Sequence, residues 1–357
     1  MKDSKVYLTL QDGKQFVGYR FGAYGEVTGE LVFTTGMTGY LETLTDPSYY
    51  GQIVIQTFPL IGNYGITPDH QSKKSWVSAY IVREKCDEPS NFRCEGTLEQ
   101  YLEDNGIVGI YGLDTRELTK IVRETGVVNA RISNKPVKDL AEIQNYKIID
   151  AVNTVTCQQP IYMGNPNGTR IVVWDFGAKN NIAQELVNRG CYCIQVPSFY
   201  TAEQILALNP QGLMLCNGPG DPSENVEVIG NIKKLVGKVP IFGICLGHQL
   251  LALAMGGRTK KMKYGHRGAN QPVKCLHTGR VYISSQNHGY EVISSSVQGV
   301  GQLSYVNAND GTCEGFDYPD YNAFTVQFHP EAMGGPRDAS FLFDRFLKNI
   351  TEGKFNA

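Results

Sequence analysis

The chain has 357 residues, of which 41% are hydrophobic, which is enough for roughly two domains with cores of their own. Its formal net charge of −2 gives no electrostatic reason to expect nucleic acid or an anionic membrane as the main partner. No apolar run approaches the roughly 18 residues of a membrane span, and the N-terminus has no secretory apolar segment. We therefore expect a soluble, cytoplasmic protein with no membrane or nucleic-acid partner.

Residues 1–151 are expected to form a mixed α/β domain. The segment "KVYLTLQDGKQFVGYRF" alternates apolar and polar residues around a central "DG", which predicts a β-hairpin. Further strands are predicted at "GELVFTT", "GQIVIQT" and "WVSAYIV", and helices at "GTLEQYLEDNG" and "DTRELTKIVRETG". We expect the second helix to begin at Asp114, with Glu117 three residues later, and to end at Gly126.

A different pattern follows residues 152–169, where prolines, glycines and asparagines interrupt the periodicity and predict a linker. From 170 to 357, short apolar strands alternate with helical segments, beginning with "RIVVWDFG", "KNNIAQELVNRG" and "CYCIQVP" and continuing to "KVPIFGI". This alternation predicts βαβ units and a doubly wound, mostly parallel sheet. Ligands of such sheets bind beyond the carboxyl ends of the strands, where "CNGPGDP" and Cys245 lie.

The nine cysteines are scattered along the chain, without the paired spacing of a zinc site or the density of a disulfide framework. Cys191 and Cys193 lie two residues apart, but no second pair of ligands lies near them in the sequence. We therefore expect reduced thiols and no metal ion.

Cys245 occupies the middle of "GICLG", directly after an apolar strand and before a helical segment. A free cysteine is often only a small buried core residue. This spacing and context, however, match a nucleophile elbow, in which the flanking glycines allow a sharp turn that presents the nucleophile. The N-terminus of the following helix favours the thiolate form. We predict that Cys245 is a catalytic nucleophile.

A nucleophilic cysteine needs a base, and the chain has six histidines. We expect His70 in a surface loop, His248 packed against the sheet, and His288 in a polar turn as a candidate to line the site. His329 ends the β-rich run "AFTVQFHPEA". Residues i and i+2 of an extended segment point the same way, so Glu331 is predicted to orient His329 and to stabilise its protonated form.

The elbow, the His-x-Glu ending and the "CNGPGDP" loop together resemble the class I, triad-type glutamine amidotransferases. Within them, the chain most resembles the family of small, glutamine-hydrolysing subunits of carbamoyl-phosphate synthetase. The resemblance covers nearly the whole chain and rests on "VFTTGMTGYLETLTDPSYYGQIV", "GIYGLDTRELTKIVRETG", "FGICLGHQLLALAMGG", "SSQNHGYEV" and "VQFHPEAMGGPRD". The strings in the first half distinguish this family from other amidotransferases.

The resemblance implies a family-specific domain at 1–151 and a class I amidotransferase domain at 170–357. It makes Cys245 the nucleophile, His329 the base and Glu331 the group that orients it. It also implies an L-glutamine site, with backbone N–H groups of Leu246 and Gly218 as the oxyanion hole. The implied glutamine-binding residues are Ser48, Gly218, Gly220, Leu246, Gln249, Asn287, Gly289 and Tyr290, the last standing where the family commonly has phenylalanine.

The resemblance further implies a large synthetase subunit as partner, which makes carbamoyl phosphate from ammonia, bicarbonate and ATP for arginine and pyrimidine biosynthesis. ATP and Mg²⁺ are expected on that partner and no cofactor on this chain, which has no phosphate-binding loop motif. Two alternatives remain. A stand-alone cysteine hydrolase for γ-glutamyl substrates would not need so large a first domain, and a binding module with a decayed site would not need an intact triad.

Overall fold

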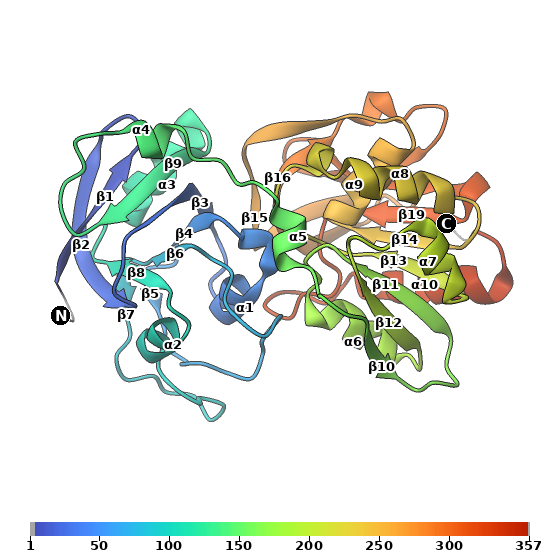
Figure 1. The fold of residues 1–357 in the computed structure, drawn as a ribbon, viewed down its shortest axis with the longest axis horizontal. Helices are drawn as coiled ribbons and strands as arrows, with labels where there is room; N and C mark the ends of the chain where they lie inside the picture. The colour runs from blue at the N-terminus through green and yellow to red at the C-terminus, as the bar shows by residue number, and fades with distance from the viewer. Residues whose placement is uncertain (1–3, 356–357) are drawn as a thin grey trace. The chain divides into compact units, whose positions relative to one another are not determined.

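The computed structural model describes residues 4–355, and the chain divides into two compact units, Met1–Ile149 and Asp150–Ala357 (Figure 1). Within the described residues, no helix combines the length and the apolar composition that crossing a membrane requires. Each unit has apolar clusters of its own, as two domains with separate cores require.

The first unit is built on a closed seven-stranded barrel with the strand order β1-β2-β8-β6-β4-β3-β9. The predicted hairpin is confirmed, because β1 and β2 pair antiparallel around a turn at Gly13, whose φ of 88° suits glycine. The strands are β1 (Lys5–Leu10), β2 (Gln15–Gly22), β3 (Val27–Thr34), β4 (Gln52–Gln56), β6 (Ala79–Ile81), β8 (Val108–Tyr111) and β9 (Val128–Ser133), with a separate pair β5 (Leu60–Ile61) and β7 (Glu84–Lys85).

Neighbouring residues of the barrel strands point to opposite faces and enter different apolar clusters. Leu31 packs in the cluster that includes helix α3, whereas Val32 packs in the cluster that includes α1 and α2. The helices of this unit are α1 (Tyr40–Thr45), α2 (Leu98–Asp104), α3 (Thr115–Thr125) and α4 (Ala141–Gln144), together with the short η1 (Pro47–Tyr49). Both sides of the barrel wall are therefore covered by apolar packing.

The predicted ends of α3 are confirmed by its caps. The Asp114 side chain accepts a hydrogen bond from the backbone N–H of Glu117 at 3.0 Å, which satisfies one amide that has no carbonyl partner inside the helix. At the other end Gly126 has a φ of 97°, a conformation that suits glycine and stops the helix. Local sequence signals therefore predict where this helix begins and ends, and Leu118 and Val122 pack it against the barrel.

The second unit is built on a ten-stranded sheet with the order β10-β12-β11-β13-β14-β19-β18-β17-β15-β16. Its central strands β12, β11, β13, β14 and β19 pair parallel, as the alternation of strands and helices predicted. The strands are β10 (Ile161–Gly164), β11 (Arg170–Asp175), β12 (Tyr192–Pro197), β13 (Gly212–Leu215), β14 (Ile241–Ile244), β15 (Thr259–Cys275), β16 (Val281–Val292), β17 (Gln302–Asn307), β18 (Cys313–Tyr318) and β19 (Ala323–Val326).

Helices cover both faces of this parallel core, which is the doubly wound arrangement (Figure 1). Side chains of α7, α8 and α9 join one apolar cluster, and those of α6 and α10 join the cluster on the other face. The helices are α5 (Ala151–Val155), α6 (Asn180–Asn188), α7 (Ala202–Ala207), α8 (Val226–Leu235), α9 (Leu246–Ala254) and α10 (Phe341–Glu352), with short turns η2 (Pro222–Glu224), η3 (Ser294–Ser296) and η4 (Pro319–Tyr321).

Antiparallel strands extend the parallel core on both sides. Strands β15 to β18 lie beyond β19, and β15 and β16 form a long hairpin with irregular register. On the opposite edge, β10 pairs antiparallel with β12. The segment 152–169 thus contains most of α5 and all of β10, and it lies within the second unit.

Candidate active site

Cys245 lies at the point where β14 ends and α9 begins. Its φ of 54° and ψ of −103° are unusual for a residue with a side chain, and such a conformation costs on the order of 1–3 kcal/mol. The surrounding backbone holds it, because its N–H donates to the carbonyl of Val326 at 2.9 Å on the neighbouring strand β19. The predicted sharp turn between strand and helix is present, and the sheet supports it.

The two glycines that flank Cys245 are required by close packing. A Cβ on Gly247 would lie 2.2 Å from the carbonyl oxygen of Leu215, and one on Gly243 would lie 2.8 Å from Cγ2 of Thr325. The first contact is with backbone, which cannot rotate away. The start of α9 therefore approaches β13 at a distance that only glycine allows.

His329 and Glu331 form a buried pair. Nδ1 of His329 lies 2.7 Å from Oε1 of Glu331, and their side chains are 1% and 0% exposed. The prediction that an extended segment aligns them is wrong, because β19 ends at Val326. His329 forms an isolated bridge with Ser285, and Pro330 and Glu331 lie in a turn. The turn, rather than strand periodicity, brings the carboxylate to the ring.

Opposite charges keep this pair ionised. Burial and the charge of Lys179 lower the pKa of His329, but Glu331 and the thiol of Cys245 outweigh them and raise that pKa to about 10. Burial raises the pKa of Glu331, but the charges of His329 and Lys179 bring it down to about 2. At neutral pH the ring is therefore an imidazolium beside a carboxylate, and it holds a proton that it can donate.

The other nitrogen of the ring faces the nucleophile's side of the site. Nε2 of His329 makes no well-formed hydrogen bond with any described residue, and the thiol of Cys245 is close enough to act on the pKa of the ring. The sulfur itself lies 3.7 Å from the backbone oxygen of Asn287. Nucleophile, proton carrier and carboxylate thus lie in sequence, as a triad requires.

Strand β16 brings further predicted residues to this place. The side-chain nitrogen of Gln249, on α9, donates to the carbonyl of Tyr290 at 2.8 Å and to Oε1 of Gln327 at 2.9 Å. The backbone carbonyl of Asn287, also on β16, lies beside the sulfur of Cys245. Gln249 therefore connects helix α9 to strand β16 beside the thiol, and Gln327, which was not among the predicted site residues, accepts its second hydrogen bond.

Comparison with known proteins decides the family. Residues 8–132 match the family model for the CPSase domain of the carbamoyl-phosphate synthase small chain. Residues 172–349 match the family model for class-I glutamine amidotransferases. The carbamoyl phosphate synthase small chain of Clostridium perfringens is 49% identical over 96% of this chain and 99% of its own length. That of Bacillus caldolyticus is 50% identical over 98% and 97%, respectively. The chain belongs to the carbamoyl phosphate synthase small chain family.

Four of the residues that the resemblance implies for glutamine binding are characterised by their local backbone structure. Gly218 packs against the elbow, since a Cβ there would lie 2.7 Å from Cδ2 of Leu246 and 2.2 Å from a backbone oxygen. Gly220 has a φ of 88° and lines a cavity of about 500 Å³ together with α5 and α8. Gly289 follows His288 on β16. Ser48 lies in η1 of the first unit, where its N–H donates to Asp46 at 2.9 Å.

Lys179 is a member of the site that sequence reasoning missed. Its Nζ lies 3.4 Å from Oε1 of Glu331, and the two side chains are 4% and 0% exposed. Lys179 follows β11 in "FGAKNN", and ligands of parallel sheets bind at the carboxyl ends of the strands. Its position after this strand could therefore have marked it as a candidate site residue. A lysine beside a carboxylate 152 positions later has no local pattern that would have linked the two.

The predicted packing role of His248 is confirmed. The ring is completely buried, its Nδ1 lies 2.8 Å from the hydroxyl of Thr325, and desolvation lowers its pKa to about 3. A histidine that stays neutral inside the core does not exchange protons with a substrate. His288 is also buried and lies on a strand rather than in a turn, and its ring nitrogens lie 2.9 Å from the carbonyl of Tyr290 and 3.0 Å from the side-chain oxygen of Gln286.

Proposed function

We propose that this chain is the glutamine-hydrolysing subunit of a carbamoyl phosphate synthase, and that it releases ammonia for use by a large partner subunit. The observation that carries the proposal is the buried series of Cys245, His329 and Glu331 at a strained elbow, in a chain that matches the family over nearly its full length. A cysteine with a charged histidine beside it is the arrangement that amide hydrolysis requires.

The first half of the reaction forms a thioester. The Cys245 thiolate attacks the side-chain amide carbon of glutamine, and the negative charge that develops on oxygen is stabilised by the N–H groups of Leu246 and Gly218. Leu246 is the first residue of α9, so its N–H has no carbonyl partner within the helix. His329 then donates its proton to the departing nitrogen, which leaves as ammonia.

The second half releases glutamate. His329, now neutral, removes a proton from a water molecule, which attacks the γ-glutamyl thioester and frees Cys245. Glu331 stabilises the imidazolium in both halves, and Lys179 holds the carboxylate in turn. Glutamine would be bound by Gln249, Asn287, Gly289 and Tyr290 of the second unit, together with the residues of the glycine loop, Gly218 and Gly220, and Ser48 of the first unit.

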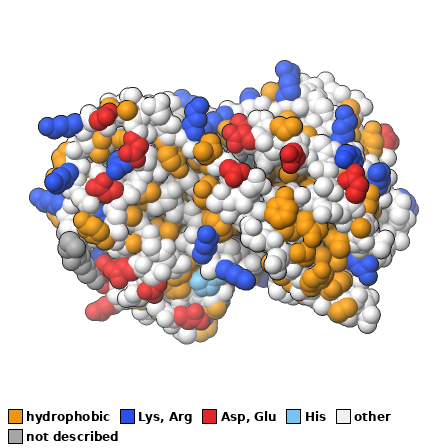
Figure 2. Space-filling view, in the orientation of Figure 1, with side chains coloured by type: hydrophobic (Ala, Val, Ile, Leu, Met, Phe, Trp, Pro, Cys, Tyr) orange, Lys and Arg blue, Asp and Glu red, His pale blue; other side chains and the backbone are white. Residues whose placement is uncertain are grey.

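The partner in this proposal is a large synthetase subunit that holds ATP and Mg²⁺. Hydrophobic side chains gather on the face of the second unit in Figure 2, and Tyr162, Phe199 and Val226 are each more than half exposed in this unit. Apolar groups of this kind are common where proteins associate. All nine cysteines are free thiols, which fits a reducing compartment, and we propose the cytoplasm as its location.

Kinetics of the purified chain, alone and with its large subunit, test the proposal. We expect slow release of glutamate from glutamine by the chain alone, strong stimulation by the partner, and carbamoyl phosphate when bicarbonate and ATP are added. Cys245→Ser should abolish glutamate release, whereas the control Cys94→Ser, at a partly buried thiol of the first unit, should leave it unchanged. Fast hydrolysis that ignores the partner would favour the stand-alone γ-glutamyl hydrolase instead.

A further inference from the structure

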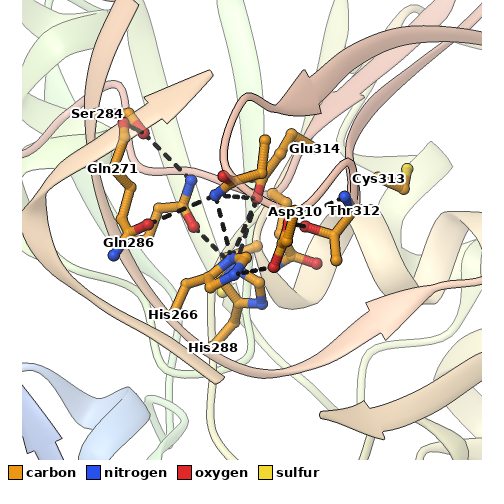
Figure 3. Close-up of polar contacts among 12 residues, drawn as sticks. His266, Gln271, Ser284, Gln286, His288, Asp310, Thr312, Cys313 and Glu314 are labelled. Carbon is orange, nitrogen blue, oxygen red and sulfur yellow. Dashed lines mark hydrogen bonds and ion pairs between the residues drawn. The ribbon is translucent and has the colours of Figure 1, made fainter. Parts of the chain in front are cut away.

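A second group of ionisable side chains lies on the antiparallel extension of the sheet. His266 on β15 and His288 on β16 are cross-strand partners, with ring centroids 5.0 Å apart, and Glu314 reaches them from β18. All three are buried, and one nitrogen or oxygen atom from each lies within 4.8 Å of the other two. Figure 3 shows the two rings and the carboxylate directed toward a common point.

Hydrogen bonds on the far side of each ring determine which nitrogen faces that point. Nε2 of His266 lies 2.9 Å from the carboxylate of Asp310, and Nδ1 of His288 lies 2.9 Å from the backbone oxygen of Tyr290. Both neighbours only accept hydrogen bonds, so each of these nitrogens carries the proton. In the neutral form of each ring the opposite nitrogens, Nδ1 of His266 and Nε2 of His288, carry lone pairs, and they lie 3.4 and 3.9 Å from Oε1 of Glu314. Nδ1 of His266 also lies 3.4 Å from the side-chain nitrogen of Asn307.

With both rings neutral, two lone pairs and the carboxylate of Glu314 face one another in a buried place. Glu314 is 0% exposed, and its Oε2 has no hydrogen-bond partner among the described residues. The side-chain oxygen of Gln286 lies 3.0 Å from Nε2 of His288, and the side-chain nitrogen of Asn307 donates to Oε1 of Glu314 only at 3.5 Å. A buried carboxylate without a strong donor is costly, and a cation at the common point removes that cost.

The donor set selects the class of cation. Two imidazole nitrogens and one carboxylate oxygen are the ligands of Zn²⁺ and neighbouring transition metals, whereas Mg²⁺ and Ca²⁺ prefer oxygen alone. Bonds of about 2.0–2.1 Å at tetrahedral angles separate neighbouring ligand atoms by about 3.4 Å. The observed 3.4 and 3.9 Å from the two rings to Glu314, in a cluster whose ligand atoms all lie within 4.8 Å of one another, therefore need a closing movement of the side chains to reach this spacing. Hydrogen bonds from the second nitrogen of each ring are also what metal-binding histidines normally have.

We propose that His266, His288 and Glu314 bind one transition-metal ion of the Zn²⁺ class, with the side-chain oxygen of Gln286 available as a fourth ligand. No spacing in the sequence pointed to it, because each ligand comes from a different strand. The site is separate from the triad, and the metal takes no part in amide hydrolysis.

The site has a consequence for glutamine binding, and this consequence rests on the proposed function. His288 stands between Asn287 and Gly289 on β16, and its Nδ1 lies 2.9 Å from the carbonyl of Tyr290, which also accepts a hydrogen bond from the side-chain nitrogen of Gln249. A metal behind β16 would fix the strand that carries half of the glutamine pocket. Loss of the metal should raise the KM for glutamine more than it lowers kcat.

Titration of the metal-free full chain with Zn²⁺ and with Co²⁺ tests the binding itself. Calorimetry should give one high-affinity site, and the absorption of bound Co²⁺ should show nitrogen and oxygen ligands without a thiolate band, which excludes the nine cysteines as ligands. Saturation should also raise the Tm. Repeating the titration with Cys245→Ser removes the catalytic thiol as a competing ligand, and the site should persist.

Variants assign the site to the cluster. Glu314→Gln keeps the shape but removes the charged ligand, and should weaken binding by more than about 100-fold, beyond the 10–100-fold typical of lost supporting groups. Asp310→Asn, at a partly exposed position, should weaken it by about 10–100-fold without touching a ligand. His277→Gln is the matched control, since that histidine pairs with Asp317 outside the cluster.

Two results would overturn the proposal. The first is the lack of a saturable site in the wild-type chain. The second is a metal affinity of Glu314→Gln or Asp310→Asn equal to that of the control His277→Gln. That result would mean that a shared proton, and not a metal ion, lies between these groups. Either result would stand regardless of glutaminase activity, so failure of this inference and failure of the proposed function are separately visible.

Discussion

Replacing Glu331 by glutamine tests the electrostatic account of the site, because it removes one charge and keeps the shape. The carboxylate lies 2.7 Å from the ring of His329 and 3.4 Å from Nζ of Lys179, and all three side chains are at most 4% exposed. Glutamine at this position can still hydrogen-bond with the ring, but it leaves the lysine ammonium buried without its counter-charge.

The size of the effect follows from the distance. At an effective dielectric constant of about 20, two unit charges 3.4 Å apart attract by about 5 kcal/mol. Breaking a buried pair from one side costs about 3–5 kcal/mol of the free energy of unfolding. Loss of the orienting carboxylate in a catalytic triad lowers kcat by up to about 10⁴-fold, and we expect about 10²–10⁴-fold for Glu331→Gln.

A double variant separates the two effects. Lys179→Met in the Glu331→Gln background removes the unpaired lysine charge, so we expect most of the lost unfolding free energy to return. The lost kcat should not return, because the ring of His329 still has no carboxylate. Urea unfolding at pH 7 and glutamate release measure the two quantities on the same preparations. A double variant as unstable as Glu331→Gln, or a single variant with nearly normal stability and kcat, would refute this reasoning.

Three further outcomes are expected. Gly247→Ala should lower the free energy of unfolding by about 1–3 kcal/mol or more and abolish activity, because its Cβ would lie 2.2 Å from a backbone oxygen. Gly230→Ala in α8 is the control: its Cβ would meet open space, and the free energy of unfolding should rise by up to about 1 kcal/mol. Thr201→Ala should cost about 1 kcal/mol in urea unfolding, since Thr201 and the residue at N3 form the capping box of α7. The difference in unfolding free energy between the wild type and Glu331→Gln should be largest between about pH 4.5 and 6.5. It should fall as the pH rises toward about 10, where His329 loses its proton, and as it drops toward about 2, where Glu331 gains one, when measured as urea midpoints against pH.

Local patterns in the sequence were enough to predict much of this protein. The βα alternation from residue 170 predicted the parallel core, and the caps of α3 lie where Asp114 and Gly126 predicted them. The glycines around Cys245 predicted the turn between strand and helix. These features are readable because a turn, a cap or a period of two or 3.6 residues depends on neighbours in the chain. The long sequence segments that resemble the family also predicted which kind of first domain the chain has.

Tertiary structure decided which distant residues meet. Closure of the barrel, and the addition of β15 to β18 beyond β19, depend on pairings between strands far apart in the chain, which local periodicity does not encode. For the same reason Lys179 beside Glu331, and His266 and His288 beside Glu314, were not predicted, although each residue was visible in the sequence. A nucleophile elbow is a local shape, whereas a buried cluster of charges exists only once the sheet has brought its strands together.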